Sequence, residues 1–214
     1  MRTALRTATA LALAIPFIAS AVPASAGSSY MSRESGSYAD AYFQGQGEIE
    51  GIDGNYFAAG LSFQGSFNYG WVEAFDCEGD ETPGGDGSEP GDCERLGSYD
   101  AQVTSLTVVE GKGKGASSRY VGTVDLYEYN FDDPFPTETP AVTNLAFDVT
   151  LTPSGGTSRS TSTYTYRDHE AGVFYSFRDT VVQTYATADG DFGGIPAVDG
   201  SVGTFKRSSM ERIS

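Results

Sequence analysis

The chain has 214 residues, of which 39% are hydrophobic, and its 13 basic and 29 acidic side chains give a net charge of −16. This length suits one domain that buries a core without metals. The negative charge makes nucleic acid and anionic membranes poor partners, because phosphate groups are bound by clustered basic residues. With His169 as the only histidine, the sequence also excludes metal centres built from several imidazoles.

The first 26 residues have the organisation of a secretory signal peptide. A basic start with Arg2 and Arg6 is followed by an uncharged, mostly apolar stretch over 7–22 and by small residues at the cleavage site. This stretch is shorter than the roughly 20 residues that span a membrane. We therefore expect cleavage after Ala26 and a secreted domain over 27–214 without a membrane anchor. Loss of the two arginines leaves 11 basic and 29 acidic side chains, a net charge of −18.

In the rest of the chain, apolar residues alternate with polar ones and no window has the spacing of an amphipathic helix. Strands are predicted at 37–44, 56–74, 101–109, 118–129, 144–152, 159–168, 173–186 and 201–206. The segment 56–74 is expected to fold back at 64–66, and a hairpin turn is expected at 153–157. A slip in the apolar alternation near Thr104 and Ser105 predicts a β-bulge. About nine strands then form a single antiparallel all-β domain, either a meander-type barrel or a two-layer sandwich.

Cys77 and Cys93 are the only cysteines, and an oxidising compartment allows such a pair to persist as a disulfide. The bond would close an acidic loop over 77–93 that contains no apolar side chain beyond proline. Carboxylates in and beside this loop make Ca²⁺ the one cofactor that we consider. They include Asp76, Glu78, Asp80, Asp86 and Asp92. Their spacing departs from a helix-flanked calcium loop, so a solvated, disulfide-tied loop is the preferred interpretation.

Two acidic residues lie at positions of the same odd or even parity as aromatic residues of their strands. Glu73 shares the parity of Phe57 and Trp71, and Asp179 shares that of Tyr175. If both sets face inward, two carboxylates lie among aromatic rings, where a raised pKa permits general-acid catalysis. Such a pair could cleave a glycosidic bond. The preferred alternative is that each acid meets an arginine, for example Arg178 or Arg119, or lies in water at a strand end.

Aromatic residues on polar strand faces offer a binding surface. Planar rings beside Asp, Asn and Thr are typical of neutral-saccharide recognition, in which rings stack and polar groups orient the sugar. A proline-rich loop over 130–140 adds a further aromatic side chain. The candidates are Tyr127 and Tyr129 on the polar face of one strand, Tyr164 and Tyr166 on one face of another, Phe135 in this loop, and Trp71 as the only tryptophan. The alternative is that these tyrosines cover a second packed face of a sandwich.

We therefore predict a secreted, non-catalytic β-module that binds a partner protein or a neutral saccharide, with no cofactor unless the acidic loop holds Ca²⁺. One alternative is a secreted, glycosidase-like hydrolase that uses Glu73 and Asp179. A second is an acidic structural protein of the extracellular matrix.

Overall fold

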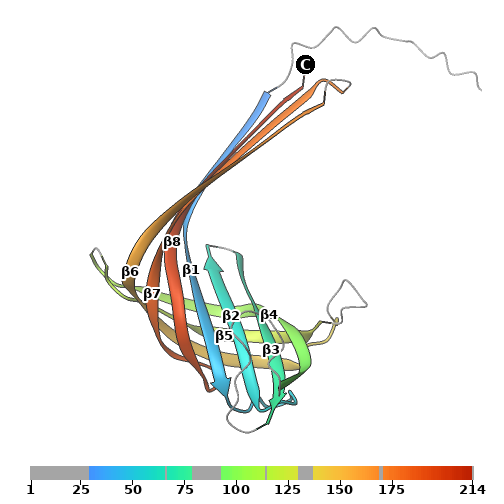
Figure 1. Ribbon diagram of the computed structural model, residues 1–214, viewed down its shortest axis with the longest axis vertical. Helices are drawn as coiled ribbons and strands as arrows, with labels where there is room; N and C mark the ends of the chain where they lie inside the picture. The colour runs from blue at the N-terminus through green and yellow to red at the C-terminus, as the bar shows by residue number, and fades with distance from the viewer. Residues whose placement is uncertain are drawn as a thin grey trace, which may run out of the picture.

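A computed structural model describes residues 29–65, 67–78, 93–113, 115–129, 137–168 and 171–213. It contains one antiparallel sheet of eight strands, in which each strand pairs with the next and β8 pairs with β1 to close a ring (Figure 1). The strands are β1 (Ser29–Gln46), β2 (Tyr56–Gln64), β3 (Phe67–Cys77), β4 (Cys93–Glu110), β5 (Ser118–Glu128), β6 (Val142–Asp168), β7 (Val173–Phe192) and β8 (Ile195–Ile213). The predicted all-β antiparallel domain is confirmed, and it forms a closed meander rather than a sandwich. Within the described ranges, no helix is long and apolar enough to cross a membrane.

The strand count is eight rather than nine, because the hairpin predicted at 153–157 is not a turn. β6 continues through this segment, and its register with β7 shifts between Pro153 and Thr157. Proline and glycine are tolerated inside a strand where the ladder is irregular, which explains why their presence was misleading. The fold-back at Gly65 and the bulge between Val103 and Ser105 are confirmed.

Large side chains fill the inside of the ring. Phe63 stacks on Tyr120 with ring centroids 4.6 Å apart, and Ile49 and Ile52 of the β1–β2 connection pack against the same core. The largest fully buried side chains are Phe43, Phe57, Phe147, Phe192, Ile49, Leu61, Leu126, Leu151, Ile195, Val72, Val124 and Val149. Small barrels are commonly filled in this way. A ligand site is therefore expected on the outside of the ring.

β2 and β3 turn opposite parities toward this core. Odd-numbered residues of β2 face inward, whereas in β3 the even-numbered positions around Val72 do so. The cause is the register, in which Gln64 pairs with Phe67 and every odd residue therefore faces an even one. The expectation that one inward set runs through both strands is wrong, and Trp71 and Glu73 lie on the outer side of the ring.

Four strands continue beyond the ring as a projecting sheet, here called the arm (Figure 1). It consists of residues 29–38, 158–168, 173–183 and 203–213, paired in the order β1, β8, β7, β6. Alternate residues point to opposite faces. Even-numbered residues of β1 lie on the face that continues the outer wall of the ring, called the outer face. Odd-numbered residues of β1 lie on the face that continues the core side, called the inner face. The register places odd-numbered residues of β6 and even-numbered residues of β7 and β8 on this same inner face.

Candidate functional site on the outer wall of the ring

Two adjoining hollows on the outer wall share Asp40 and Ser62. The smaller, of about 100 Å³, is lined also by Tyr42, Gly60, Leu61, Tyr69, Gly70 and Trp71. The larger, of about 240 Å³, extends onto the outer face of the arm and is lined also by Tyr38, Gln64, Val181, Gln183, Phe205 and Arg207. Together they form the outer-wall site, in which aromatic rings alternate with hydrogen-bonding groups.

Strand register brings these side chains together. Asp40 of β1 lies directly opposite Ser62 of β2 on one side and Ser201 of β8 on the other. In the next outward-facing row, Gly60 lies between Tyr42 and Trp71. Residues directly opposite each other share a face of the sheet, so both rows point outward.

Asp40 is held by two serines at the centre of the site. The Ser62 hydroxyl donates to Oδ1 at 2.7 Å, and the Ser201 hydroxyl donates to Oδ2 at 3.0 Å. Ser201 is only 3% exposed, so it supports the carboxylate from below. Each carboxylate oxygen accepts more than one hydrogen bond. The fixed carboxylate can therefore still accept bonds from a ligand.

The Trp71 indole lies against the wall because residue 60 is glycine. A Cβ added at Gly60 would lie 2.6 Å from Trp71 Nε1 and 2.9 Å from Cε2, closer than side chains can approach. The absence of a side chain at this point lets the ring rest on the strand while 41% of the residue stays exposed. This arrangement presents a flat aromatic surface beside Asp40.

Two phenols at this site remain proton donors. Burial raises the pKa of Tyr38 above 10.0, and the Asp40 carboxylate raises it further. Burial and the carboxylates of Asp40 and Asp199 likewise raise the pKa of Tyr42. Both hydroxyls therefore stay neutral and protonated at physiological pH, and can donate hydrogen bonds to ligand oxygens.

The predicted aromatic residues lie in three different places. Tyr127 belongs to the same cross-strand row as Trp71, separated from it by Asp100. Tyr129 follows β5, and its backbone N–H donates to the Ser98 carbonyl at 2.8 Å. Tyr164 and Tyr166 are exposed on the outer face of the arm, where Tyr166 lies opposite Tyr175. Phe135 lies outside the described residues.

The two predicted catalytic acids lie in different parts of the molecule. Glu73 is on the ring, with Oε1 3.2 Å from Nη1 of Arg95. Asp179 is on the outer face of the arm, with Oδ2 3.5 Å from Nε of Arg207. Its other oxygen, Oδ1, is buried without a hydrogen bond. The fold therefore gives each acid an arginine neighbour, although neither is the arginine expected, and the two do not form the pair that the hydrolase hypothesis needs.

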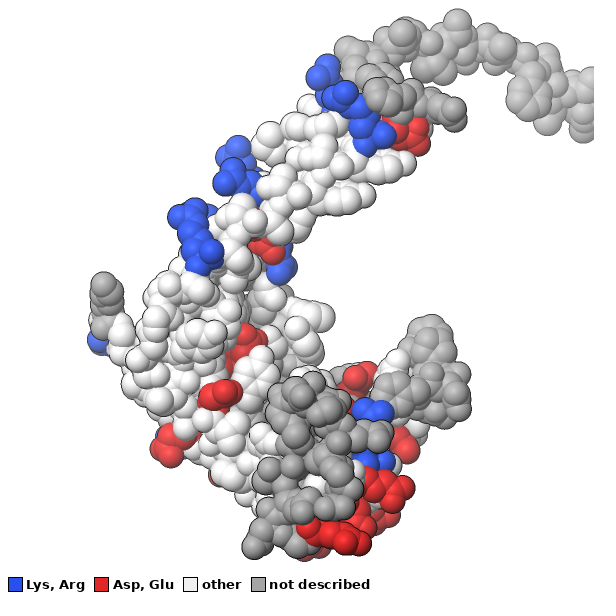
Figure 2. All heavy atoms as spheres, viewed as in Figure 1, with Lys and Arg blue, Asp and Glu red and all other residues white. Residues whose placement is uncertain are grey.

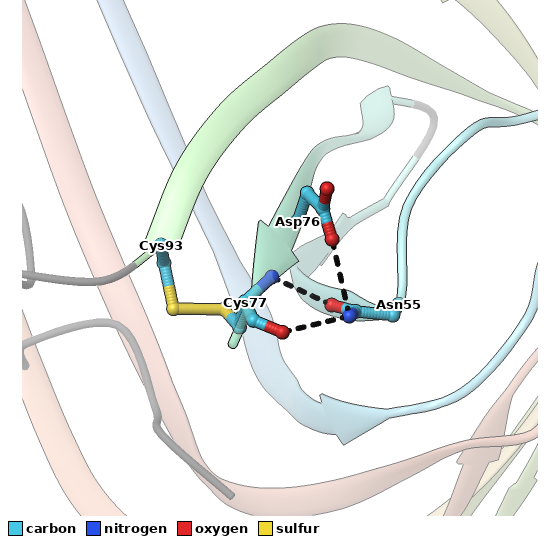
Figure 3. The surroundings of a disulfide bond; sticks show 4 residues. All are labelled: Asn55, Asp76, Cys77 and Cys93. Atoms are coloured by element: carbon cyan, nitrogen blue, oxygen red, sulfur yellow. Dashed lines mark hydrogen bonds between the residues drawn. A yellow bond between two sulfur atoms is a disulfide. The ribbon is translucent and has the colours of Figure 1, made fainter. Parts of the chain in front are cut away.

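The predicted disulfide is present between Cys77 and Cys93, which are direct partners at the end of the β3–β4 ladder (Figure 3). Asn55 secures the same end of β3: its side-chain oxygen accepts from the Cys77 N–H at 2.9 Å, and its amide nitrogen donates to Asp76. Of the other proposed calcium ligands, Glu78 is exposed, and Asp80, Asp86 and Asp92 lie outside the described residues. In the described part of the chain, no group of three or more potential metal ligands occurs.

Sequence reasoning missed the centre of the site. The residues Tyr38, Asp40 and Tyr42 alternate within a predicted strand, a pattern that places all three on one face. That signal was available. The role of Ser201 was not, because it lies 161 residues from Asp40 along the chain.

Comparison with protein-family models, curated proteins and solved structures finds no match to this chain.

Proposed function

We propose that this chain is a secreted, non-catalytic module that binds neutral saccharides at the outer-wall site. The observation that carries the proposal is the Asp40 carboxylate, oriented by two serines and flanked by Tyr42 and Trp71. Aromatic rings stack on the apolar faces of sugars, while an oriented carboxylate accepts hydrogen bonds from their hydroxyls. The Cys77–Cys93 disulfide is compatible with an extracellular location.

The surroundings favour a neutral ligand over an anionic one. The outward-facing row of Tyr42 and Trp71 contains Asp100 and Asp199, and the neighbouring row contains Asp40 and, across three intervening strands, Asp125. Their field repels anions but leaves sugar hydroxyls unaffected. The tyrosine hydroxyls add hydrogen-bond donors. The site therefore offers both the donors and the acceptors that the hydroxyl groups of a sugar require.

A cationic ligand is the second candidate, because a carboxylate among aromatic rings also suits an ammonium group. Trp71 and Tyr42 would supply cation–π contacts, and Asp40 would supply the countercharge. Choline is a simple probe. If choline binds more tightly than any saccharide, and Asp40→Asn abolishes that binding, the cationic interpretation replaces the saccharide one.

Co-sedimentation with insoluble cellulose, chitin and α-glucan tests the proposal, with soluble oligosaccharides in calorimetry to measure affinity. We expect at least one polysaccharide to retain the protein. Trp71→Ala should weaken binding by about tenfold, since it removes the stacking surface. Asp40→Asn keeps the shape of the side chain but alters its acceptors, and should also weaken binding.

Tyr166→Ala is the matched control, because it removes an exposed aromatic ring from the arm and leaves the outer wall unchanged. An equal loss in this variant would show that Trp71 acts only as one of many exposed rings. Retention by none of the polysaccharides would reject the saccharide proposal. Release of sugar fragments that stops in Glu73→Gln would instead support the hydrolase alternative.

A further inference from the structure

The two faces of the arm differ in charge. Cross-strand register places Arg33 opposite Ser208, Ser208 opposite Arg178, and Lys206 in the neighbouring row of the same face. Every basic residue of the arm except Arg207 lies on this inner face: Arg33, Arg159, Arg167, Arg178, Lys206 and Arg212. Among the residues described, the inner face carries no acidic side chain. The four acids of the arm lie on the outer face, namely Glu34, Asp168, Asp179 and Glu211.

A groove crosses the inner face over all four strands. It has a volume of about 490 Å³. Arg33, Arg159, Arg178 and Lys206 line it together with Ser35, Thr180 and Ser208. Glu34 and Arg207 also belong to its lining, although the register assigns their side chains to the outer face. Each of the four strands contributes at least one cation. The groove is therefore a concave cationic surface with hydroxyl groups between the charges.

The spacing of the cations suits a ligand with several negative charges. Arg33 and Arg178 are separated by one strand, which places their Cα atoms about 10 Å apart, and Lys206 lies about 8 Å from each. Arg167 and Arg212 extend the same face toward the end of the arm. The row of Arg159 and the row of Arg167 lie about 27 Å apart along the strands. A linear chain with regularly repeated anions matches this length.

The arm contrasts with the rest of the molecule. It holds seven of the 11 basic residues that follow residue 26 and only four acidic ones, whereas the remaining sequence holds four basic and 25 acidic side chains. Figure 2 shows Lys and Arg mainly along the arm and Asp and Glu mainly over the ring. The negative net charge of the whole chain therefore does not exclude an anionic partner at the arm.

We infer that the inner face of the arm is a second binding site and that it takes an acidic polysaccharide bearing carboxylate or sulfate groups. The cations supply the attraction, and the hydroxyls of Ser35, Thr180 and Ser208 supply hydrogen bonds to sugar and anion oxygens. A narrow polymer chain reaches the floor of a concave groove, which a planar bilayer surface does not.

Single-stranded nucleic acid is a weaker match to the same face. Proteins that bind it combine basic residues with aromatic platforms on which bases stack. Phe174 is the one aromatic residue on the inner face among those described, and the Arg167 guanidinium already covers it, 5.5 Å from the ring centroid. The groove thus offers charge and hydroxyl groups without free stacking surfaces.

Calorimetry with polygalacturonate and with heparin, at low and high salt, tests this inference on the full secreted chain. Polygalacturonate supplies carboxylates and heparin supplies sulfates, so the pair also identifies the preferred anion. We expect binding that weakens as salt rises. Neutralising three cations in the variant Arg33→Gln/Arg178→Gln/Lys206→Gln should reduce affinity by about tenfold or more and flatten the salt dependence.

The matched control is Arg95→Gln/Lys112→Gln/Arg119→Gln, which changes the net charge equally but on the ring. An equal loss in both triple variants would show a general charge effect and overturn the site, as would absence of binding at low salt. Tighter binding to single-stranded DNA or to phosphatidylglycerol vesicles would overturn the assigned ligand. Sedimentation velocity tests for self-association. Oligomers that form at low salt and are absent in the arm variant would show that the groove binds a second copy of this chain.

The two sites are distinguishable in the same experiments. Trp71→Ala should leave polyanion binding unchanged, because Trp71 lies on the outer wall and not on the inner face of the arm. Failure of the acidic-polysaccharide inference would therefore leave the neutral-saccharide proposal intact, and the reverse also holds.

Discussion

Replacing Gly60 by alanine separates the shape of the outer-wall site from the stability of the fold. The added methyl would lie 2.6 Å from Trp71 Nε1, whereas ordinary contacts between non-bonded heavy atoms are about 3.5–4.0 Å. Because the clash involves the far end of a side chain, the indole can move and the backbone can stay in place. We expect Trp71 to shift outward by about 1 Å or to change rotamer.

The cost of this shift to folding is small. If about 50 Å² of the indole surface becomes exposed, at about 25 cal/mol per Å², the loss is about 1.3 kcal/mol. Alanine in place of glycine regains roughly 0.4–1 kcal/mol by restricting the unfolded chain. The free energy of unfolding should therefore change by less than about 1 kcal/mol. Saccharide affinity should nevertheless fall by about two- to tenfold, since a displaced indole loses its stacking geometry.

Trp71 is the only tryptophan, so its fluorescence reports directly on the shift. We expect emission from Gly60→Ala at longer wavelength, a nearly unchanged urea midpoint and weaker saccharide binding. Gly156→Ala is the control, because an added Cβ there meets no atom within 4 Å. Unchanged emission, or unchanged affinity despite shifted emission, would refute the role assigned to the Trp71–Gly60 contact.

Two further predictions concern the ring. The double variant Cys77→Ser/Cys93→Ser loses a cross-link between residues 16 apart in the sequence. Loop-closure entropy predicts that its free energy of unfolding, measured in urea, falls by about 3 kcal/mol. Equal urea midpoints for oxidised and reduced wild-type protein would contradict this. A hydrogen bond and an ion pair from Arg119 hold the pKa of Asp148 below its ordinary 3.8. The stabilisation that these two contacts give the folded protein is therefore present at neutral pH and is lost as the pH falls below about 4. Asp148→Asn should therefore make the urea midpoint less sensitive to acid, by a modest amount because both side chains are partly exposed; an acid profile identical to wild type would argue against it.

The alternation of apolar and polar residues in the sequence predicted the core correctly where one face of a strand is buried and the other is exposed to solvent. Phe147, Val149 and Leu151 alternate cleanly and are all buried. The same reasoning failed at 153–157, because proline and glycine mark both turns and irregular strands. What decides between the two is whether a neighbouring strand pairs on both sides of the segment, and β7 does. Local composition does not contain that information.

The outer-wall site was predictable only in part for the same reason. Trp71 could be selected because it is the only tryptophan in the chain. The importance of Asp40 depends on hydrogen bonds from Ser62 and Ser201, which lie 22 and 161 residues away. Serine is among the common residues of this chain, so nothing in the sequence marks these two. Strand pairing, and not residue type, gives them their role.

Net charge does not describe the local charge of a surface, since it averages over parts of the molecule that lie far apart. β1, β6, β7 and β8 each bring basic residues to the inner face of the arm, while the excess of acids stays with the rest of the chain. Arg33 lies six residues beyond Ala39, the first residue of β1 that pairs with β2, a distance of about 20 Å along an extended strand. At physiological salt, electrostatic interactions between exposed charges fade over about 8 Å. An anion bound beside Arg33 would therefore be largely screened from the acidic ring and would respond to the arm alone. The proposed acidic polysaccharide and the proposed neutral saccharide would then bind opposite faces of one strongly acidic protein.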